Sequence, residues 1–475
     1  MDPELLAPTI LDRSSHTISR RDIDPDALKV LYRLNGHGFI AYLVGGAVRD
    51  LLLHRRPADF DVGTDAHPNQ IKKLFRNAFL IGRRFRLAHV RFQDGKVIEV
   101  STFRRKPDEE ELAAEREEER LAGEAPTPVP VPIPGRPPLR PIAFGTPRED
   151  AFRRDITINA LFYDISTYSV IDYVGGLEDL RLGRIRVIGE PGERFVEDPV
   201  RIWRVVRHAS RLGFAIEEAT ERAIAPHLPL LAKAAGSRLF EELNKDLKKG
   251  ASRAFFELAR RHALLPIILG VVGATYERSD GAFSRLAGNL AAIDAAVARG
   301  SSPSADMVYA LLLWPWAEGV LAATQGDKAR ALYDAFREAK AAATIPKGIL
   351  LDAVQTLVIV DQMLEALTTG RMRWGVRKRA HYPGASKLAS FLVQGSFGRG
   401  EDPFAGIFQD RFRGLRGAGP DEAGAAAGES EAGEAGAGGE AAAGEAGLPG
   451  ERPHRRRRRR RRPHRKPPAP QAPPA

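Results

Sequence analysis

The chain has 475 residues, enough for two or three domains, and a formal net charge of +11. It contains no cysteine, which excludes a disulfide framework and any zinc site with cysteine ligands. The longest apolar runs, such as residues 263–274, fall short of the roughly 20 residues that a membrane span needs. The first residues lack the apolar core of a secretory signal. We therefore expect a cytoplasmic protein without a membrane partner.

The first part of the chain reads as alternating helices and strands. Residues 1–26 are polar and we expect them to be loose. Apolar spacing then predicts a helix in "DALKVLYRL", a buried strand in "FIAYLVGG" and a helix in "PNQIKKLFRNA". The stretch "HVRFQDGKVIEVSTF" predicts a hairpin turned at Asp94–Gly95.

The remainder divides by composition. Residues 106–146 are acidic and then proline-rich, which predicts a flexible insert, because α/β signals resume after it. From about residue 198 to 415 the apolar spacing predicts helices almost throughout. Residues 417–450 are mostly Gly, Ala and Glu and predict a disordered linker. Residues 451–475 hold ten Arg and one Lys against one Glu, a net +10, and predict a disordered arm that binds a polyanion.

Two aspartates, Asp59 and Asp61, stand two residues apart in "DFDV". On a β-strand such residues face one side, while Phe60 and Val62 pack on the other. Two carboxylates held so close repel each other unless a cation lies between them. Hard oxygen ligands suit Mg²⁺, and such a pair can hold two ions for displacement at phosphorus. The pair therefore predicts a two-metal Mg²⁺ site, with two solvated aspartates as the alternative.

Two glycines, Gly45 and Gly46, precede this pair and open a short predicted helix. They allow the backbone to approach a phosphate closely, and a helix N-terminus attracts anions. Either feature alone is a common chance match, but the two together at this spacing favour phosphoryl chemistry.

The stretch "GGAVRDLLL…DFDV" resembles the signature of the nucleotidyltransferase superfamily that includes DNA polymerase β. More narrowly, it is similar to the first motif of class II tRNA CCA-adding enzymes and bacterial poly(A) polymerases. Further blocks resemble later motifs of that family in the same order: "RRDITINALFYD", "GGLEDLRLGRIRVIG", "EDPVRIWRVVRHASRLGF" and "SRLFEELNKDL". The resemblance covers about residues 40–250. It implies an α+β fold, with a polymerase-β-like head of mixed sheet and helices followed by an all-helical neck and body.

This resemblance implies a division of the chain. The expected parts are a loose N-terminus (1–26), a nucleotidyltransferase head (27–185) with the insert 106–146, a helical neck with a base-selecting motif (186–260), a helical RNA-binding body (261–416), the linker (417–450) and the arginine-rich arm (451–475).

The resemblance also implies the reaction and its residues. An RNA 3′-hydroxyl would attack the α-phosphate of ATP, with Asp59 and Asp61 as metal ligands and Asp155 contacting the ribose or supporting the metals. Glu99 stands where the superfamily often has a third carboxylate, or is an outward acid of an alternating hairpin. The nucleotide would be bound by Gly45, Gly46, Arg49, Arg154, Asn159, Asp198 and Arg201.

The motif "EDPVR" implies base selection by Asp198 and Arg201. Their separation of three predicts neighbours on one helical face. A carboxylate accepts from an exocyclic amine and a guanidinium donates to a ring nitrogen, a pattern that adenine and cytosine share and uracil and guanine lack. The pair alone therefore does not separate polyadenylation from CCA addition.

Three blocks resemble the poly(A) polymerases in particular: "LIGRRFRLAHVRF", "SRLFEELNKDLKKG" and the arginine arm. We therefore expect template-independent addition of AMP to single-stranded RNA 3′ ends by a monomer, marking RNA for decay, with RNA-decay proteins as further partners. The alternative is a tRNA nucleotidyltransferase that adds all or part of CCA. An inactive RNA-binding scaffold is disfavoured, because the implied catalytic and base-selecting residues are all present.

Overall fold

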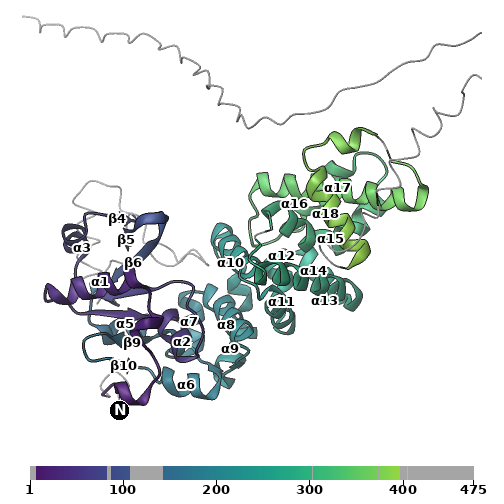
Figure 1. Ribbon diagram of the computed structural model, residues 1–475. Helices are drawn as coiled ribbons and strands as arrows, with labels where there is room; N and C mark the ends of the chain where they lie inside the picture. Colours follow the sequence, from purple (N-terminus) through teal and green to yellow (C-terminus); the bar gives the residue numbers. More distant parts are fainter. Residues whose placement is uncertain are drawn as a thin grey trace, which may run out of the picture. The chain divides into compact units, whose positions relative to one another are not determined.

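The computed structural model describes residues 7–82, 87–106, 143–301, 303–372, 374–395 and Phe404. Within these residues, eight strands form one mixed sheet in the order β1-β10-β9-β2-β3-β6-β5-β4 (Figure 1). Only the β3–β6 pair is parallel among the described strands of this sheet. The strands are β1 (Thr9–Leu11), β2 (Ala41–Val44), β3 (Asp61–Thr64), β4 (Ala78–Ile81), β5 (Leu87–Arg91), β6 (Val97–Thr102), β9 (Leu161–Asp164) and β10 (Ser169–Asp172).

One face of the sheet is covered by three helices, α1 (Pro25–Gly36), α2 (Gly46–Leu52) and α3 (Pro68–Leu74). Asp24 fixes the start of α1, because its carboxylate accepts from the backbone N–H groups of Asp26 and Ala27. Apolar side chains of the helices and of alternate strand residues form the main core: Val30, Leu34, Val48, Ile71, Leu43, Val62, Val90 and Val100 are among its members. The helices predicted over α1 and α3 are confirmed.

The opposite side of the sheet, which we call the second face, carries a smaller apolar cluster. It comprises Val44, Phe103, Phe162 and residues of α5 (Pro147–Arg153). Gly63 lies on this face, because a Cβ there would meet the Phe103 ring at 2.6 Å. Since residues two apart on a strand share a face, Asp61 lies on the second face as well.

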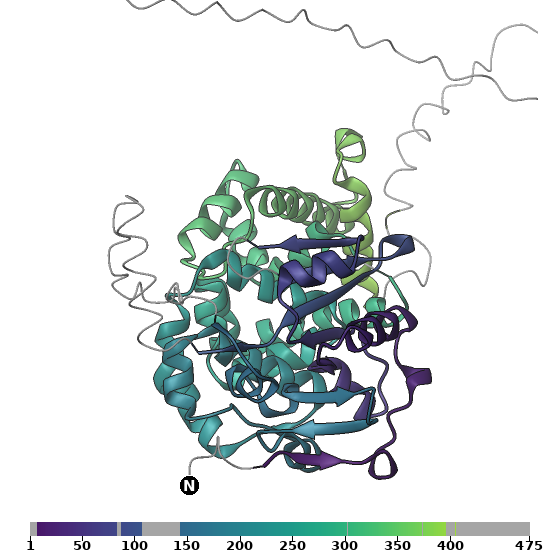
Figure 2. The ribbon, with the colours of Figure 1, turned by 90° about the vertical axis from the view of Figure 1, so that its left-hand side faces the viewer.

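The described part of the N-terminal segment is built into the sheet, so the expectation that residues 1–26 are loose is wrong from residue 7 onward. Thr9 pairs with Asp172 and Leu11 with Val170, which makes β1 the edge strand beside β10 (Figure 2, β1 in purple). The 3₁₀ helices η2 (Arg13–Ser15) and η3 (Arg20–Asp22) follow. Two buried isoleucines, Ile18 and Ile23, anchor the segment, too few to reveal it by composition.

The predicted hairpin is confirmed, with β5 and β6 joined through η4 (Gln93–Gly95). The predicted insert falls mainly on residues 107–142, which lie outside the described residues. Both its ends are described and paired, because β7 (Arg104–Arg105) is antiparallel to β8 (Ala143–Phe144). Residues 106 and 143 are thus held close together whatever lies between them.

The described residues beyond the sheet are helical, as predicted, apart from a two-residue strand β12 (Ala215–Ile216) that pairs with β11 (Arg184–Ile185). The remaining helices are η5 (Thr157–Asn159), α6 (Gly176–Leu182), α7 (Pro191–Glu197), α8 (Val200–Leu212), α9 (Glu218–Leu231), α10 (Gly236–Lys248), α11 (Ser252–Arg261), α12 (Leu265–Leu269), α13 (Val271–Arg278), α14 (Asp280–Ala298), α15 (Ala305–Ala323), α16 (Lys328–Glu338), α17 (Lys347–Thr369), η6 (Trp374–Lys378) and α18 (Tyr382–Gln394).

A buried ionic cluster joins α8 to α10. The side chain of Arg207 is only 5% exposed and pairs with Glu242 and Asp246, with Nε 2.6 Å from Asp246 Oδ1. The Trp203 indole N–H donates to Asp246 Oδ2 at 2.6 Å. We call these four residues the Arg207 cluster. Because every charge in it has a partner, the cluster fixes α8, and with it the residues at the start of that helix.

All described residues belong to one compact unit, and a single main core includes residues from Ile18 to Phe404. The boundaries between head, neck and body therefore stay predictions. The linker and the arm lie outside the described residues. No helix in the described part of the chain combines the length and apolar character that crossing a membrane requires.

Candidate active site

Asp61 is the first residue of β3 and pairs with Val44, the last residue of β2. The chain turns into α2 directly after Val44, through Gly45 and Gly46. The predicted carboxylates and the predicted glycines therefore meet where the central strands β2 and β3 end, and we call this end of the strands the sheet edge. Asp59 is exposed, whereas Asp61 is partly buried.

The electrostatics of this edge favour a bound cation. Burial, the Asp59 carboxylate and then the Glu99 carboxylate raise the pKa of Asp61 to about 7, and Arg154 only partly opposes this. A divalent cation between Asp59 and Asp61 would relieve the repulsion, so the residues fit the predicted metal. In the described residues, no three His, Cys, Asp or Glu side chains form one group that could hold a metal ion. The effect of Glu99 on Asp61 that the structure shows is that of its charge, which raises the Asp61 pKa.

Gly45 needs its lack of a side chain. Its φ is +73°, and a Cβ there would lie 3.2 Å from Arg154 Nη1. Three predicted nucleotide-binding residues surround this turn: Arg49 Nη1 donates to Asn159 Oδ1 at 2.7 Å, and Arg154 Nη1 donates to the Asn159 carbonyl at 3.2 Å. The structure therefore brings Gly45, Gly46, Arg49, Arg154 and Asn159 together at the edge that carries Asp61.

Asp155 lies deeper than predicted for a residue that contacts ribose. It is 8% exposed, and its Oδ2 is 2.8 Å from Arg204 Nε on α8. Burial alone would raise the pKa of Asp155, but the Arg204 charge, the electrostatic effect of His208 and backbone hydrogen bonds together outweigh it and hold that pKa well below its usual range. Next to it, His208 Nε2 lies 3.3 Å from Asn159 Nδ2, and burial lowers the pKa of His208 well below its ordinary value. A neutral imidazole and a carboxylate–guanidinium pair thus connect the sheet edge to α8.

The predicted arrangement of Asp198 and Arg201 is wrong in one respect. They are not neighbours on a helical face, because Asp198 is extended, at φ −149° and ψ 95°, between α7 and α8. Pro199 explains this, since the residue before a proline is driven out of helical geometry. Arg201 lies in the first turn of α8 and donates to Glu197 at 3.1 Å and to the Arg194 carbonyl at 2.8 Å.

The partner of Asp198 is Arg238, near the start of α10. Arg238 Nη1 and Nη2 donate to the two Asp198 carboxylate oxygens at 2.8 and 2.6 Å. The Val200 N–H donates to Oδ1 as well. This pairing could not be predicted from the sequence, although Arg238 lies inside the block "SRLFEELNKDL" that resembles a family motif. Arg204 and His208 were also missed, because their partners Asp155 and Asn159 lie on other elements. Glu197, which pairs with Arg194 and Arg201, was missed as well.

Asp198 and Arg201 both retain hydrogen-bonding sites that a ligand could use. Among the described contacts, Asp198 uses three of about four lone-pair sites, which leaves one on Oδ2. Arg201 uses only Nη1 of a guanidinium with five N–H donors. Asp198 thus retains an acceptor and Arg201 retains donors.

Loss of Arg238 should blur base selection. In Arg238→Ala, Asp198 loses its two-point anchor, so we expect KM for ATP to rise about tenfold and discrimination against UTP and GTP to fall. Arg238→Lys should restore only part of this, because an ammonium group makes no two-point contact. Single-nucleotide incorporation kinetics with each NTP measure the effect. Lys248→Ala, at an exposed base on the same helix, is the control, and equal selectivity in both variants would contradict the anchoring role.

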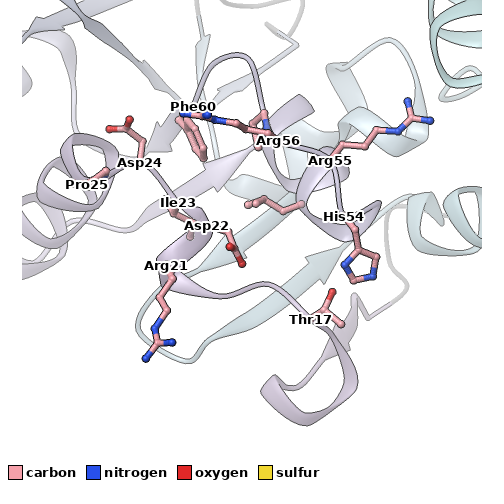
Figure 3. A pocket seen from close by; sticks show the side chains of 12 residues that line it. Thr17, Arg21, Asp22, Ile23, Asp24, Pro25, His54, Arg55, Arg56 and Phe60 are labelled. Atoms are coloured by element: carbon pink, nitrogen blue, oxygen red, sulfur yellow. The ribbon is translucent and has the colours of Figure 1, made fainter.

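A cavity of about 520 Å³ lies near the carboxylates but belongs to the other side of the sheet (Figure 3). Its lining comes from residues 17–25 and from residues 51–60, including Phe60, which packs against the main core. The Arg55 side chain extends away from the other lining residues. Asp24 at its rim is already engaged in capping α1. We therefore place no part of the reaction in this cavity.

Residues 41–186 match the family model described as "Poly A polymerase head domain". Residues 213–272 match the one described as "Probable RNA and SrmB- binding site of polymerase A". The chain is 40% identical to Poly(A) polymerase I of Salmonella typhi over 358 residues, which are 75% of this chain and 72% of that protein. The chain belongs to the poly(A) polymerase I family. The resemblance read from the motifs is thereby confirmed, and the chain is a nucleotidyltransferase.

Relatives of the second type are less similar. The CCA-adding enzyme of Bacillus pumilus is 36% identical over 223 residues, 47% of this chain and 49% of that protein. The solved CCA-adding enzyme of Bacillus stearothermophilus in complex with CTP matches with a TM-score of 0.51 and 26% identity, covering 78% of this chain and 83% of that chain. The predicted fold class, a polymerase-β-like head followed by helices, is confirmed by this match.

Proposed function

We propose that the chain transfers AMP from ATP to the 3′ end of single-stranded RNA without a template. The observation that carries this proposal is the 40% identity to a poly(A) polymerase I across three quarters of the chain, against 36% to a CCA-adding enzyme across less than half. Tails added in this way would mark RNA for decay in the cytoplasm, with RNA-decay proteins as partners.

In the proposed reaction the RNA 3′-hydroxyl oxygen bonds to the α-phosphorus of ATP. The bond between the α-phosphorus and the bridging oxygen breaks, pyrophosphate leaves, and the hydroxyl proton passes to water. Such a transfer needs positioning and charge neutralisation more than covalent help. Arg49 and Arg154, held by Asn159 beside the Gly45 turn, would orient and neutralise the triphosphate.

Asp59 and Asp61 would hold Mg²⁺. When bound, Mg²⁺ would stabilise the negative charge that develops on the attacking and leaving oxygens. The support from this chain is the unrelieved repulsion at Asp61, which a cation at that position removes. Asp155 would act as a positioning residue, because its contact with Arg204 aligns α8 with the sheet edge.

Base selection would use the capacity that Asp198 and Arg201 retain. The free lone pair on Asp198 Oδ2 suits the exocyclic amine of adenine, and the free Arg201 donors suit a ring nitrogen. Cytosine offers the same pattern. A preference for ATP over CTP therefore has to come from the shape of the site around this pair.

A primer-extension assay tests the function. We expect long homopolymer on an unstructured oligoadenylate with ATP, and little product with CTP, UTP or GTP. The second substrate is a tRNA without its 3′ CCA. Addition of two or three nucleotides to that tRNA, with no extension of the oligoadenylate, would establish the CCA alternative instead.

A further inference from the structure

A single row of side chains crosses the second face of the sheet from the carboxylates to the edge strand. The register pairs Val62 with Val100, so Asp61 lies beside Glu99. Glu99 pairs with His89 of β5, and His89 pairs with Phe79 of β4. The His89 Nε2 to Glu99 Oε1 distance of 3.5 Å shows that these neighbours approach each other through their side chains. The row Asp61–Glu99–His89–Phe79 therefore joins the candidate active site to β4.

The far end of this row is apolar, basic and exposed. Phe79 is 48% exposed and Ile81 is 42% exposed, both on β4. The Arg91 guanidinium lies 4.7 Å from the centroid of the Phe79 ring, and Lys72 Nζ lies 5.1 Å from it. In the described part of the chain, Arg91 and Lys72 have no carboxylate within ion-pair distance. This surface therefore joins an aromatic ring to two uncompensated positive charges.

These side chains are poorly explained by folding alone. The helices α1, α2 and α3 pack on the other face, where Ala78, Ala88 and Val90 belong to the main core. Figure 1 places β4, β5 and β6 at one end of the sheet beside α3. A solvent-facing edge strand usually carries polar side chains, so an exposed phenylalanine here indicates that a ligand binds against it.

We propose that the β4–β5–β6 end of the second face is a stacking platform for the RNA primer. A base a few nucleotides upstream of the reacting 3′ end lies against Phe79 and the Arg91 guanidinium, while the flanking phosphates meet Arg91 and Lys72. Single-stranded RNA fits this chemistry, because bases stack on aromatic rings and guanidinium planes and phosphates pair with Arg and Lys. The inference rests on the proposed function, since it takes RNA as the substrate.

The geometry assigns the position along the primer. Three inter-strand spacings separate Asp61 from Phe79, about 14 Å in all. This separation is about four times the 3.4 Å between successive stacked nucleotides of one strand. The 3′-terminal nucleotide, whose hydroxyl is held at Asp59 and Asp61, therefore does not reach Phe79. Only a primer of several nucleotides does so, and stacking on one ring accepts any base.

The test is a comparison of Phe79→Ala, Phe79→Trp and wild type with two oligoadenylate primers, a dinucleotide and an octanucleotide. We expect Phe79→Ala to raise KM for the octanucleotide at least about fivefold, because one base loses its stacking partner. KM for the dinucleotide should stay unchanged. Phe79→Trp should keep the octanucleotide KM, because it keeps the aromatic face. Tyr32→Ala is the matched control, an exposed aromatic residue on α1, away from the second face.

Direct binding separates this proposal from the proposed function. Fluorescence anisotropy of a labelled octa-adenylate, measured without ATP, should show a dissociation constant at least about fivefold larger for Phe79→Ala than for wild type. This measurement does not depend on extension, so it tests the platform even if wild type fails to extend either primer. Equal dissociation constants for Phe79→Ala and wild type overturn the platform. A rise in KM in Phe79→Ala that is the same for both primers also overturns the platform. So does a rise in KM that persists in Phe79→Trp, because a general effect on folding or chemistry would give either result.

Discussion

Asp61→Asn is expected to reduce nucleotide addition by at least about 100-fold at saturating ATP and primer. The change keeps the shape of the side chain but removes the charge that would hold Mg²⁺ at the transferred phosphoryl group, where charge neutralisation contributes most of the catalysis. Stability should not fall, because the ionised Asp61 and Asp59 repel each other in the folded chain. Single-turnover extension of an oligoadenylate measures the rate, and chemical unfolding measures the stability.

The chain supplies a matched control directly after the same strand. Asp65 follows the other end of β3, and its Oδ1 accepts from the Ile40 N–H at 2.8 Å. Asp65→Asn makes the same change in charge far from the glycine turn and keeps an acceptor for that bond. We expect at most a twofold change in rate. Comparable rates for Asp61→Asn and Asp65→Asn would remove the metal assignment from Asp61.

Asp246→Ala should cause the largest loss of stability, about 3–5 kcal/mol in the free energy of unfolding. The carboxylate is 1% exposed and accepts from Trp203 and Arg207, so its removal leaves a buried guanidinium with Glu242 as its one remaining acidic partner in the described structure. Burial disfavours the charge on Arg207, and the Asp246 and Glu242 carboxylates are what raise its pKa. Guanidinium unfolding followed by circular dichroism gives the difference.

Glu257→Ala is the control for this variant, because Glu257 pairs with Arg253 on the surface of α11. Exposed pairs of this kind contribute little, no more than about 0.5 kcal/mol. Because Arg201 lies in the first turn of α8 and Arg204 lies on the same helix, the buried variant should also lose base selectivity as temperature rises, before it unfolds. Equal stabilities for the two alanine variants would show that the Arg207 cluster does not carry the packing of α8 on α10.

The core of the candidate site could be predicted because its signals are local. Gly45–Gly46 and Asp61 lie within the strand–helix–strand unit β2–α2–β3, where a period of two fixes the side that Asp61 faces. Asp59 precedes β3, so the prediction that both aspartates lie on one strand is correct only for Asp61. The hairpin at Asp94–Gly95 and the helix over Ala27–Leu34 are local in the same sense. The roles assigned to these residues by resemblance stay proposals.

What could not be predicted depends on distant partners. Asp198 was placed on a helical face from its spacing to Arg201, but Pro199 ends that geometry and Arg238, forty positions on, supplies the partner. The strand β1 was missed because three residues with one inward side chain carry almost no periodic signal. The row that ends at Phe79 also depends on the register of four strands, which no spacing along the chain reveals.

The pairing of β1 with β10 has a consequence for synthesis. Thr9–Leu11 leave the ribosome long before Ser169–Asp172, on the order of ten seconds at 5–20 residues per second. During that time the first strand has no partner, and the edge it will close does not exist. Final assembly of the sheet must therefore wait until β10 emerges. A nascent chain stalled before that point would expose an unpaired strand to chaperones and to other nascent chains on the same mRNA.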